Sequence, residues 1–287
     1  MTREFRERNR LSWNAATRAH NSHKAHQAAF LRNGGSTLRA EELELLGDVA
    51  GKRLIHLLCN SGQDSLSLAA MGASVTGVDI SDEAIDFAGR LSKESGIEAS
   101  FVRADVYDWL EEARSLGDRY DLAFASYGAL PWLPDLTTWA AGVFEILEPG
   151  GRLALIEFHP AAFVFDEQWQ PRYPHGTGPT PLEWKEGVGD YVGQSGASLA
   201  PSGFEAGEER FENPHPCFEF SWSTSQVVQA LVDAGFVLKR FVEYPHANGF
   251  RQGEGMRELE GGRFAPPAGF PRIPLMYGVA AVRDRSR

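Results

Sequence analysis

The stretch "LIHLLCNSGQDSLSLAAMGASVTGVDIS", residues 54–81, decides the fold of this chain. An apolar run is followed by a short turn, a helical pattern and a second apolar run that ends at Asp79. This order is typical of a βαβ unit in which an acid about twenty residues after the turn binds a ribose diol. Such a turn commonly carries three glycines, but here only Gly62 is present, and Leu58 and Asn60 occupy the other two positions.

The missing glycines bear on which nucleotide could bind. The pyrophosphate of a dinucleotide must lie close to the backbone, and this approach requires glycine in the turn. Side chains at Leu58 and Asn60 obstruct the approach, which counts against an NAD-dependent dehydrogenase. S-adenosylmethionine has a ribose and no pyrophosphate, so it makes no such demand. Asn tolerates left-handed backbone geometry better than most residues, so the turn itself can be kept.

Apolar runs alternate with helical patterns over the rest of the chain. The predicted strands are "RLIHLLC", "ASVTGVDI", "ASFVRADV", "YDLAFASYG" and "RLALIEFHP". The predicted helices between and around them include "STLRAEELELLGDV", "DSLSLAAMG", "SDEAIDFAGRLSKESG" and "LTTWAAGVFEILEPGG". After the helix "TSQVVQALVDAGF", the segments "VLKRFVEYP" and "PLMYGVAAVRD" predict a closing antiparallel pair. The pattern therefore predicts an α/β fold with a seven-stranded, mostly parallel sheet and helices on both faces.

Changes in composition divide the chain into four regions. Residues 1–35 are polar and rich in Arg, Asn and His, and we expect short helices that form an N-terminal lid. Residues 36–159 hold the cofactor-binding core. Residues 160–222 are dense in Pro, Gly and aromatic residues, which predicts a cap inserted after the fifth strand. Residues 223–287 are predicted to complete the core sheet.

The composition disfavours several classes of protein. A net charge of -11 and a pI near 5.2 argue against nucleic acid or an anionic membrane surface as a partner. Two cysteines make no disulfide framework, and His175 and His215 lack metal-ligand spacing, so no metal site is expected. The charged N-terminus lacks the apolar core of a secretory signal, and no run of about 18 apolar residues predicts a spanning helix. We expect a cytoplasmic monomer or homodimer.

Five segments in series resemble the motifs of class I S-adenosylmethionine-dependent methyltransferases, which have a Rossmann-like fold. They are "HLLCNSGQDSLSLA", "VTGVDIS", "FVRADVYDW", "YDLAFASYGAL" and "LEPGGRLALIEFHP". Each segment alone is a weak signal, but their order and spacing over roughly residues 50–160 are specific. The sequence departs from the family pattern at His56, Leu58 and Asn60, in the region that holds the amino-acid tail of the cofactor.

The resemblance implies S-adenosylmethionine as the cofactor. Asp79 would bind the ribose, Asp105 the adenine amino group, and the backbone of Val106 an adenine nitrogen. The predicted cofactor-binding residues are Trp13, His20, Cys59, Asn60, Ser61, Gly62, Asp79, Ile80, Asp105, Val106 and Ser126. The alternatives are structural: Asp79 and Asp105 as helix or loop caps, and His56 as a core histidine.

Three residues are candidates for catalysis. Glu157 and His159 lie two apart at the end of a predicted strand, so their side chains should share one face. His can act as a base near neutral pH, and a carboxylate can orient it. Tyr127 lies beside the expected methyl position, where it is either a catalytic group or a wall of the pocket. A polar strand end without chemistry is the alternative for Glu157 and His159.

The aromatic side chains of the cap are predicted to hold a small planar acceptor. The predicted acceptor-binding residues are Trp132, Phe165, Trp169, Tyr173, Tyr191 and Trp222, with Trp184 as a further candidate. We therefore expect methyl transfer to an aromatic or heterocyclic small molecule, of indole or phenol type, as in natural-product biosynthesis. Two other functions stay open: an NAD-dependent dehydrogenase, and a non-catalytic nucleoside-binding or regulatory protein on the same fold.

Overall fold

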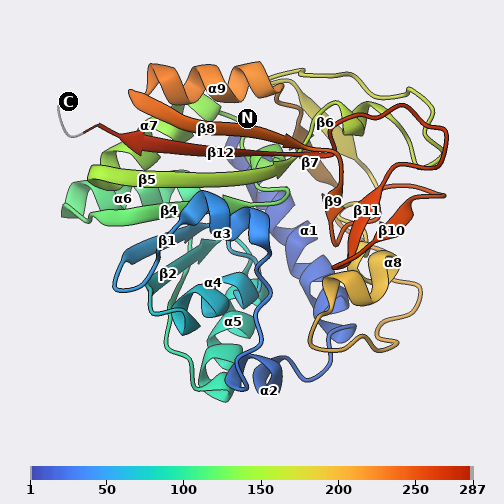
Figure 1. The fold of residues 1–287 in the computed structure, drawn as a ribbon, viewed down its shortest axis with the longest axis horizontal. Helices are drawn as coiled ribbons and strands as arrows, with labels where there is room; N and C mark the ends of the chain where they lie inside the picture. The colour runs from blue at the N-terminus through green and yellow to red at the C-terminus, as the bar shows by residue number, and fades with distance from the viewer. Residues whose placement is uncertain (1, 285–287) are drawn as a thin grey trace.

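A seven-stranded sheet forms the core of the computed structural model, which describes residues 2–284 (Figure 1). Its order is β3-β2-β1-β4-β5-β12-β8, and β12 runs antiparallel to both of its neighbours. The strands are β1 (Arg53–Leu57), β2 (Ser74–Asp79), β3 (Ser100–Arg103), β4 (Tyr120–Ser126), β5 (Leu147–Phe158), β8 (Phe236–Tyr244) and β12 (Met276–Arg283). The predicted mostly parallel sheet and the closing antiparallel pair are both confirmed.

Helices cover both faces of this sheet. One face carries α3 (Ala40–Leu46), α4 (Gln63–Ala70) and α5 (Asp82–Ser95). The opposite face carries α6 (Val106–Leu116), α7 (Leu136–Ile146) and α9 (Thr224–Asp233). Helix α6 was not predicted, although Val106, Trp109, Leu110 and Ala113 recur at helical spacing and are buried against the sheet.

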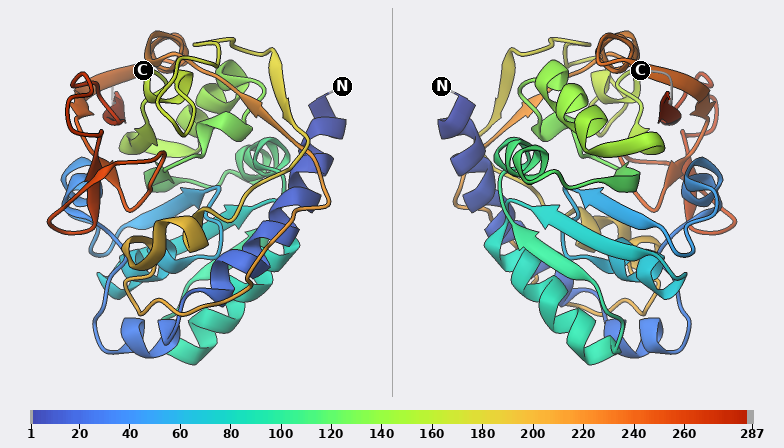
Figure 2. Two further views of the ribbon diagram at one scale, coloured as in Figure 1. Left: turned by 90° about the vertical axis from the view of Figure 1, so that its right-hand side faces the viewer. Right: turned by 90° about the vertical axis from the view of Figure 1, so that its left-hand side faces the viewer.

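The N-terminal region forms one long helix, α1 (Thr2–Ser22), and a short one, α2 (Gln27–Arg32), where short helices had been expected. Helix α1 runs along α5 and also contacts α8 (Tyr191–Ser195) and β7 (Cys217–Phe220) (Figure 2). Its buried side consists of small and polar residues, such as Asn9, Ser12, Ala16 and Ala19. Such residues give little hydrophobic periodicity, so the length of α1 could not be inferred from the sequence pattern.

The cap is built from two separate parts of the chain. In residues 160–222, β6 (Pro181–Trp184) pairs with β7, next to α8 and the short 3₁₀ helices η2 (Ala162–Val164) and η3 (Gly196–Leu199). In residues 245–275, β9 (Ala247–Asn248), β10 (Arg257–Leu259) and β11 (Arg263–Ala265) form a sheet of their own. Both parts gather beyond the carboxyl end of β5 (Figure 1).

This second part corrects the predicted boundary. Residues 223–287 do not all belong to the core sheet, because the segment between β8 and β12 leaves it and packs on the cap. Ala247 and Leu275 lie in one apolar cluster with Ala162 and Trp169. Within residues 2–284, none of the helices has the length and apolar character needed to cross a membrane.

Candidate cofactor and acceptor site

The turn after β1 keeps the geometry of a glycine-rich turn with different residues. Leu58, Asn60 and Gly62 all have left-handed backbone angles, with φ of 54°, 47° and 76°. The Asn60 side chain stabilises the turn, since its Oδ1 accepts the N–H of Ser61 at 2.6 Å. A Cβ at Gly62 would lie 2.7 Å from the Cβ of Ala88, so this position requires glycine. The turn therefore keeps its left-handed geometry without the other two glycines, as the tolerance of Asn60 for this geometry predicted.

Asp79 joins the end of β2 to this turn. Its Oδ2 accepts the N–H of Asn60 at 2.8 Å, and its Oδ1 accepts the N–H of Ser81 at 2.9 Å. Burial raises the pKa of Asp79, and these backbone N–H groups act in the opposite direction. The carboxylate is thus fixed at the carboxyl edge of the sheet, where it faces a cavity. This is the position in which a carboxylate can accept hydrogen bonds from a ribose diol.

A cavity of about 650 Å³ lies between the carboxyl ends of the strands, α1 and the cap. Its size falls within the range of roughly 300–1,000 Å³ that is typical of small-ligand pockets. The predicted cofactor residues that line it are Trp13, His20, Cys59, Asn60, Asp79, Ile80, Asp105, Val106 and Ser126. Ser61 and Gly62 are not among the lining residues; they shape the turn, and Ser61 Oγ accepts a hydrogen bond from Asn21 at 2.8 Å.

Asp105 has structural partners in addition to its place in the cavity wall. It caps α6 by accepting the N–H of Tyr107 at 2.9 Å, and it pairs with Arg6 of α1 at 2.5 Å. Asp105 therefore caps α6, as the structural alternative predicted, and its contact with adenine stays a prediction. Through this ion pair Asp105 also connects α1 to the core.

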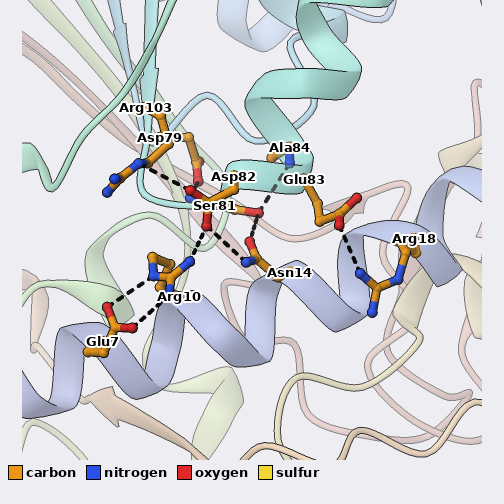
Figure 3. Close-up of polar contacts among 10 residues, drawn as sticks. All are labelled: Glu7, Arg10, Asn14, Arg18, Asp79, Ser81, Asp82, Glu83, Ala84 and Arg103. Atoms are coloured by element: carbon orange, nitrogen blue, oxygen red, sulfur yellow. Dashed lines mark hydrogen bonds and ion pairs between the residues drawn. The ribbon is translucent and has the colours of Figure 1, made fainter.

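Ion pairs and hydrogen bonds fasten α1, which contributes to the cavity wall, to the start of α5 (Figure 3). Asp82, in the first turn of α5, pairs with Arg10 and accepts a hydrogen bond from Asn14 at 3.0 Å. Ser81 Oγ donates to Asn14 Oδ1 at 2.8 Å, and Arg18 pairs with Glu83 at 2.9 Å. The side chains that α1 directs to α5 thus meet the helix end that follows Asp79, next to the predicted ribose site.

A second group of titratable residues lines the cavity near the turn, and the sequence indicated only His56 among them. His56 is buried and hydrogen-bonded to Ser65 Oγ at 2.8 Å, and burial lowers its pKa to about 4, so the ring is neutral at pH 7. Glu42 and Lys24 also line the cavity. Burial raises the pKa of Glu42 to about 8 and lowers that of Lys24 to about 8, with Asp64 opposing the shift at Lys24.

These groups fit an amino-acid tail. A carboxylate tail can pair with the Lys24 ammonium, and an ammonium can pair with Asp64, while the Glu42 carboxyl, which is mostly protonated at pH 7, can accept a hydrogen bond from it. Lys24 follows α1, Glu42 lies on α3 and Asp64 lies on α4. No spacing in the sequence connects three such separate segments, so this part of the site could not be predicted.

Glu157 has a different environment from the one predicted. Its carboxylate accepts backbone N–H groups from Gly128 at 2.5 Å, Leu130 at 3.0 Å and Phe158 at 2.7 Å. Burial raises its pKa, with these N–H groups opposing. Glu157 lines the cavity and at the same time holds the loop that follows β4.

The expected Glu157–His159 pair is not formed. His159 Nε2 lies 3.1 Å from Glu243 Oε1, and His159 Nδ1 accepts the N–H of Ala161 at 3.1 Å. His159 is also absent from the residues that line the cavity. His159 continues the pairing with β12 and contacts Tyr277 and Glu243, which align with Glu157 across the sheet, so the predicted shared face is kept although the two side chains do not meet.

Tyr127 lines the cavity, as expected for a residue in the wall of the pocket. Its hydroxyl accepts a hydrogen bond from Asn248 Nδ2 at 2.8 Å, which connects β4 to the small sheet of the cap. Burial raises the pKa of Tyr127 well above its usual range, so the phenol stays protonated near pH 7.

Most of the predicted acceptor-binding aromatics meet in the cavity. Those that line it are Trp132, Phe165, Tyr173, Trp184, Tyr191 and Trp222, joined by the unpredicted Phe158, Phe163 and Phe250. Trp169 does not line it and is a correction: its Nε1 donates to the carbonyl of Glu254 at 2.9 Å, and its ring packs 4.8 Å from that of Phe270. Glu219 of β7 also lines the cavity and was not predicted.

Comparison with known proteins finds similarity to methyltransferases. Residues 55–151 match a family model described as a methyltransferase domain. A ubiquinone biosynthesis O-methyltransferase of Xanthomonas axonopodis pv. citri (strain 306) is 31% identical over 129 residues, which cover 44% of this chain and 52% of that protein. The chain thus matches about half the length of the curated relatives.

Solved structures share the fold. A S-adenosylmethionine-dependent methyltransferase from Mesorhizobium loti has a TM-score of 0.53 at 18% identity, covering 84% of this chain and 94% of that one. A geranyl diphosphate C-methyltransferase from Streptomyces coelicolor A3(2) has a TM-score of 0.50 at 15% identity, covering 84% and 76%. Residues 55–151 thus match a methyltransferase domain, and the chain shares the fold of solved S-adenosylmethionine-dependent methyltransferases.

Proposed function

We propose that this chain transfers a methyl group from S-adenosylmethionine to a small aromatic or heterocyclic acceptor. The observation that carries the proposal is a single cavity that joins two sets of residues. One set consists of Asp79 and the left-handed turn at the end of the sheet, and the other consists of the aromatic side chains of the cap. A donor and an acceptor could therefore lie in contact, away from bulk water.

The residues present fit the cofactor. Asp79 would hold the ribose, Asp105 and Val106 the adenine, and Lys24 with Asp64 the amino-acid tail. When bound, S-adenosylmethionine supplies an electrophilic methyl group on a sulfonium. The protein's part is then to align an acceptor atom with that group and to exclude water, for which the cover formed by α1 and the cap is suited.

The surroundings support a small acceptor. The walls of the cavity come from α1 and the cap as well as from the strand ends, which suits a small ligand. The net charge of -11 also disfavours RNA or DNA. The rings of Trp132, Trp184 and Trp222 supply flat apolar walls at low cost in conformational entropy.

Within this proposal the predicted catalytic residues take other roles. Glu157 positions the loop after β4, where the methyl group would lie, and Tyr127 forms a wall. His159, paired with Glu243, connects β5 to β8. Replacing His159 by Ala should then leave turnover within a few-fold of wild type, whereas a general base would cost about 100-fold or more.

A methyl-transfer assay tests the function. The purified protein is incubated with methyl-labelled S-adenosylmethionine and a metabolite extract, and labelled products are detected by mass spectrometry. We expect a labelled small molecule that contains an aromatic or heterocyclic ring. Binding of the cofactor without any labelled product would instead support the non-catalytic alternative, and labelled nucleic acid or protein would contradict the small-molecule proposal.

A further inference from the structure

Glu219 is a carboxylate that the cap directs into the cavity. Pairing of β6 with β7 places Leu182 opposite Glu219 and Trp184 opposite Cys217, and all four residues line the cavity. Phe218, between them on β7, packs its ring 4.5 Å from that of Phe5 of α1. The side chains of Leu182, Trp184, Cys217 and Glu219 thus share one face of this strand pair, and that face lines the cavity.

Few protein groups satisfy this carboxylate. Trp184 Nε1 donates to Glu219 Oε2 at 2.9 Å, and within residues 2–284 this is the one side-chain hydrogen bond described for Glu219. No Lys, Arg or His of that part of the chain forms an ion pair with it. Glu157, by contrast, accepts three backbone N–H groups. A half-buried carboxylate with so few donors is costly unless a ligand supplies one.

Burial has a measurable consequence for this group. It raises the pKa of Glu219 to about 7, with Trp184 opposing the shift and the neighbouring carboxylate of Glu157 adding to it. A carboxylate with such a pKa can accept a proton near neutral pH and release it again.

The walls around Glu219 attract positive charge as well. The rings of Tyr173 and Trp184 meet edge to face at 5.3 Å, and Trp222 is fixed by a 2.9 Å hydrogen bond from its Nε1 to the carbonyl of Leu133. The faces of aromatic rings carry negative potential, so they favour a cation or a polarised N–H group.

Three arginines of the cavity wall have other partners, and Lys24, which lies near Asp64, is assigned above to the tail of the cofactor. Arg6 pairs with Asp105, Arg39 donates to the carbonyl of Ser198 at 2.8 Å, and Arg251 lies over the ring of Phe264. An acceptor that carries a carboxylate or a phosphate would therefore meet Glu219 without a positive charge to balance it, and binding of such an acceptor is disfavoured.

We propose, on the basis of the methyl-transfer function above, that the acceptor presents an N–H group to Glu219 and that its nitrogen is methylated. The nitrogen lone pair forms a bond to the methyl carbon of the sulfonium donor. The sulfur–methyl bond breaks, and its electron pair stays on sulfur. The Glu219 carboxylate takes one proton from the nitrogen: before the transfer where the acceptor binds as an ammonium ion, because this frees the lone pair, and during the transfer where the acceptor is a neutral N–H heterocycle. Glu219 is then a catalytic residue.

A matched set of probes tests this assignment by calorimetry on protein loaded with S-adenosylhomocysteine. Phenethylamine, 2-phenylethanol and phenylacetate share one skeleton and differ in the terminal group, and indole with benzofuran forms a second pair. We expect the nitrogen compound of each set to bind at least about 10-fold more tightly than its oxygen counterpart, a difference of about 1.4 kcal/mol. Phenylacetate should bind most weakly.

Variants connect the preference to Glu219. Glu219→Gln should remove the preference for nitrogen and leave the affinity for S-adenosylhomocysteine unchanged. Glu183→Gln is the control, because Glu183 lies on the adjacent strand β6, is exposed and is not part of the cavity wall. A preference that survives in Glu219→Gln would overturn the proposal. So would phenylacetate binding as tightly as phenethylamine, or the absence of binding by both nitrogen compounds.

The test separates this proposal from the function on which it rests. The probe titrations are repeated without S-adenosylhomocysteine, so the preference is measured whether or not that compound binds. Failure of S-adenosylhomocysteine to bind would contradict the methyltransferase function. Normal binding of S-adenosylhomocysteine with no preference for nitrogen would contradict the role of Glu219 alone.

Discussion

Replacing Gly62 by Ala should destabilise the protein through two separate effects. The left-handed backbone at this position, with φ of 76°, costs a residue with a β-carbon about 1–2 kcal/mol. The added methyl group would also lie 2.7 Å from the Cβ of Ala88 and from the ring of Phe101. Overpacking of this kind costs about 1–3 kcal/mol, so the expected loss of unfolding free energy is about 2–5 kcal/mol.

Gly96→Ala provides the matched control. Gly96 has a similar φ of 74°, but an added methyl group there would have no other atom within 4 Å. This variant should therefore lose only the backbone term, about 1–2 kcal/mol. In a protein of 287 residues, 1 kcal/mol corresponds to about 2 °C in Tm, so we expect decreases of about 2–4 °C for Gly96→Ala and about 4–10 °C for Gly62→Ala.

Thermal unfolding followed by circular dichroism measures both variants, and calorimetry measures their affinity for S-adenosylhomocysteine. Gly62→Ala should weaken binding, because the turn that includes Asn60 and contacts Asp79 must move, while Gly96→Ala should bind like wild type. Equal Tm values for the two variants would refute the reasoning, since they would show that the steric contact at Gly62 has no cost.

Four further predictions follow from the same geometry. Asp79→Ala should weaken binding of S-adenosylmethionine by about 1.5–3 kcal/mol in calorimetry, the range for lost hydrogen bonds to a charged group, and unchanged affinity in a folded variant would exclude the ribose contact. The pKa of Glu219 is raised from 4.5 to about 7, so protonation stabilises the native state below pH 4.5, and this stabilisation is lost as the pH rises to about 7. In urea unfolding, wild type should lose about 3 kcal/mol of unfolding free energy relative to Glu219→Gln between these two pH values. Parallel pH curves for the two proteins would contradict this prediction. Arg10→Ala should loosen α1 and speed release of S-adenosylhomocysteine in stopped-flow measurements, and high salt should reduce the difference from wild type, whereas identical release rates would show that α1 does not cover the ligand. Trp222→Ala should raise the Michaelis constant for the acceptor while Trp169→Ala leaves it near wild type, and the reverse order would contradict the placement of the two rings.

The elements of the core could be predicted because each carries its own periodic signal. Alternating apolar runs and helix caps lie within single segments, and Asp79 follows its turn at a fixed spacing. Helix α6 was missed despite such a signal, since Val106, Trp109, Leu110 and Ala113 have helical spacing. The separate sheet in residues 245–275 has strands of two or three residues, which are too short to show alternation.

The site could be predicted only where one segment determines it. Asp79 and the turn are local features, and both lie where they were expected. Glu219 and Lys24 enter the cavity from segments whose approach depends on tertiary packing. His159 shows the limit of a local rule, because its partner Glu243 comes from β8, which the sequence around residue 159 does not reveal. Trp169 is aromatic like the residues of the pocket wall, but its side chain packs in an apolar cluster of the cap.

The most direct test of the central claim is a calorimetric comparison of S-adenosylhomocysteine and NAD on the wild-type protein under the same conditions. The claim is that the turn with Leu58 and Asn60, together with Asp79, accepts a nucleoside that has no pyrophosphate. We predict one molecule of S-adenosylhomocysteine bound per chain and no detectable heat from NAD at the same concentrations. Saturable binding of NAD, with S-adenosylhomocysteine failing to bind, would contradict the account.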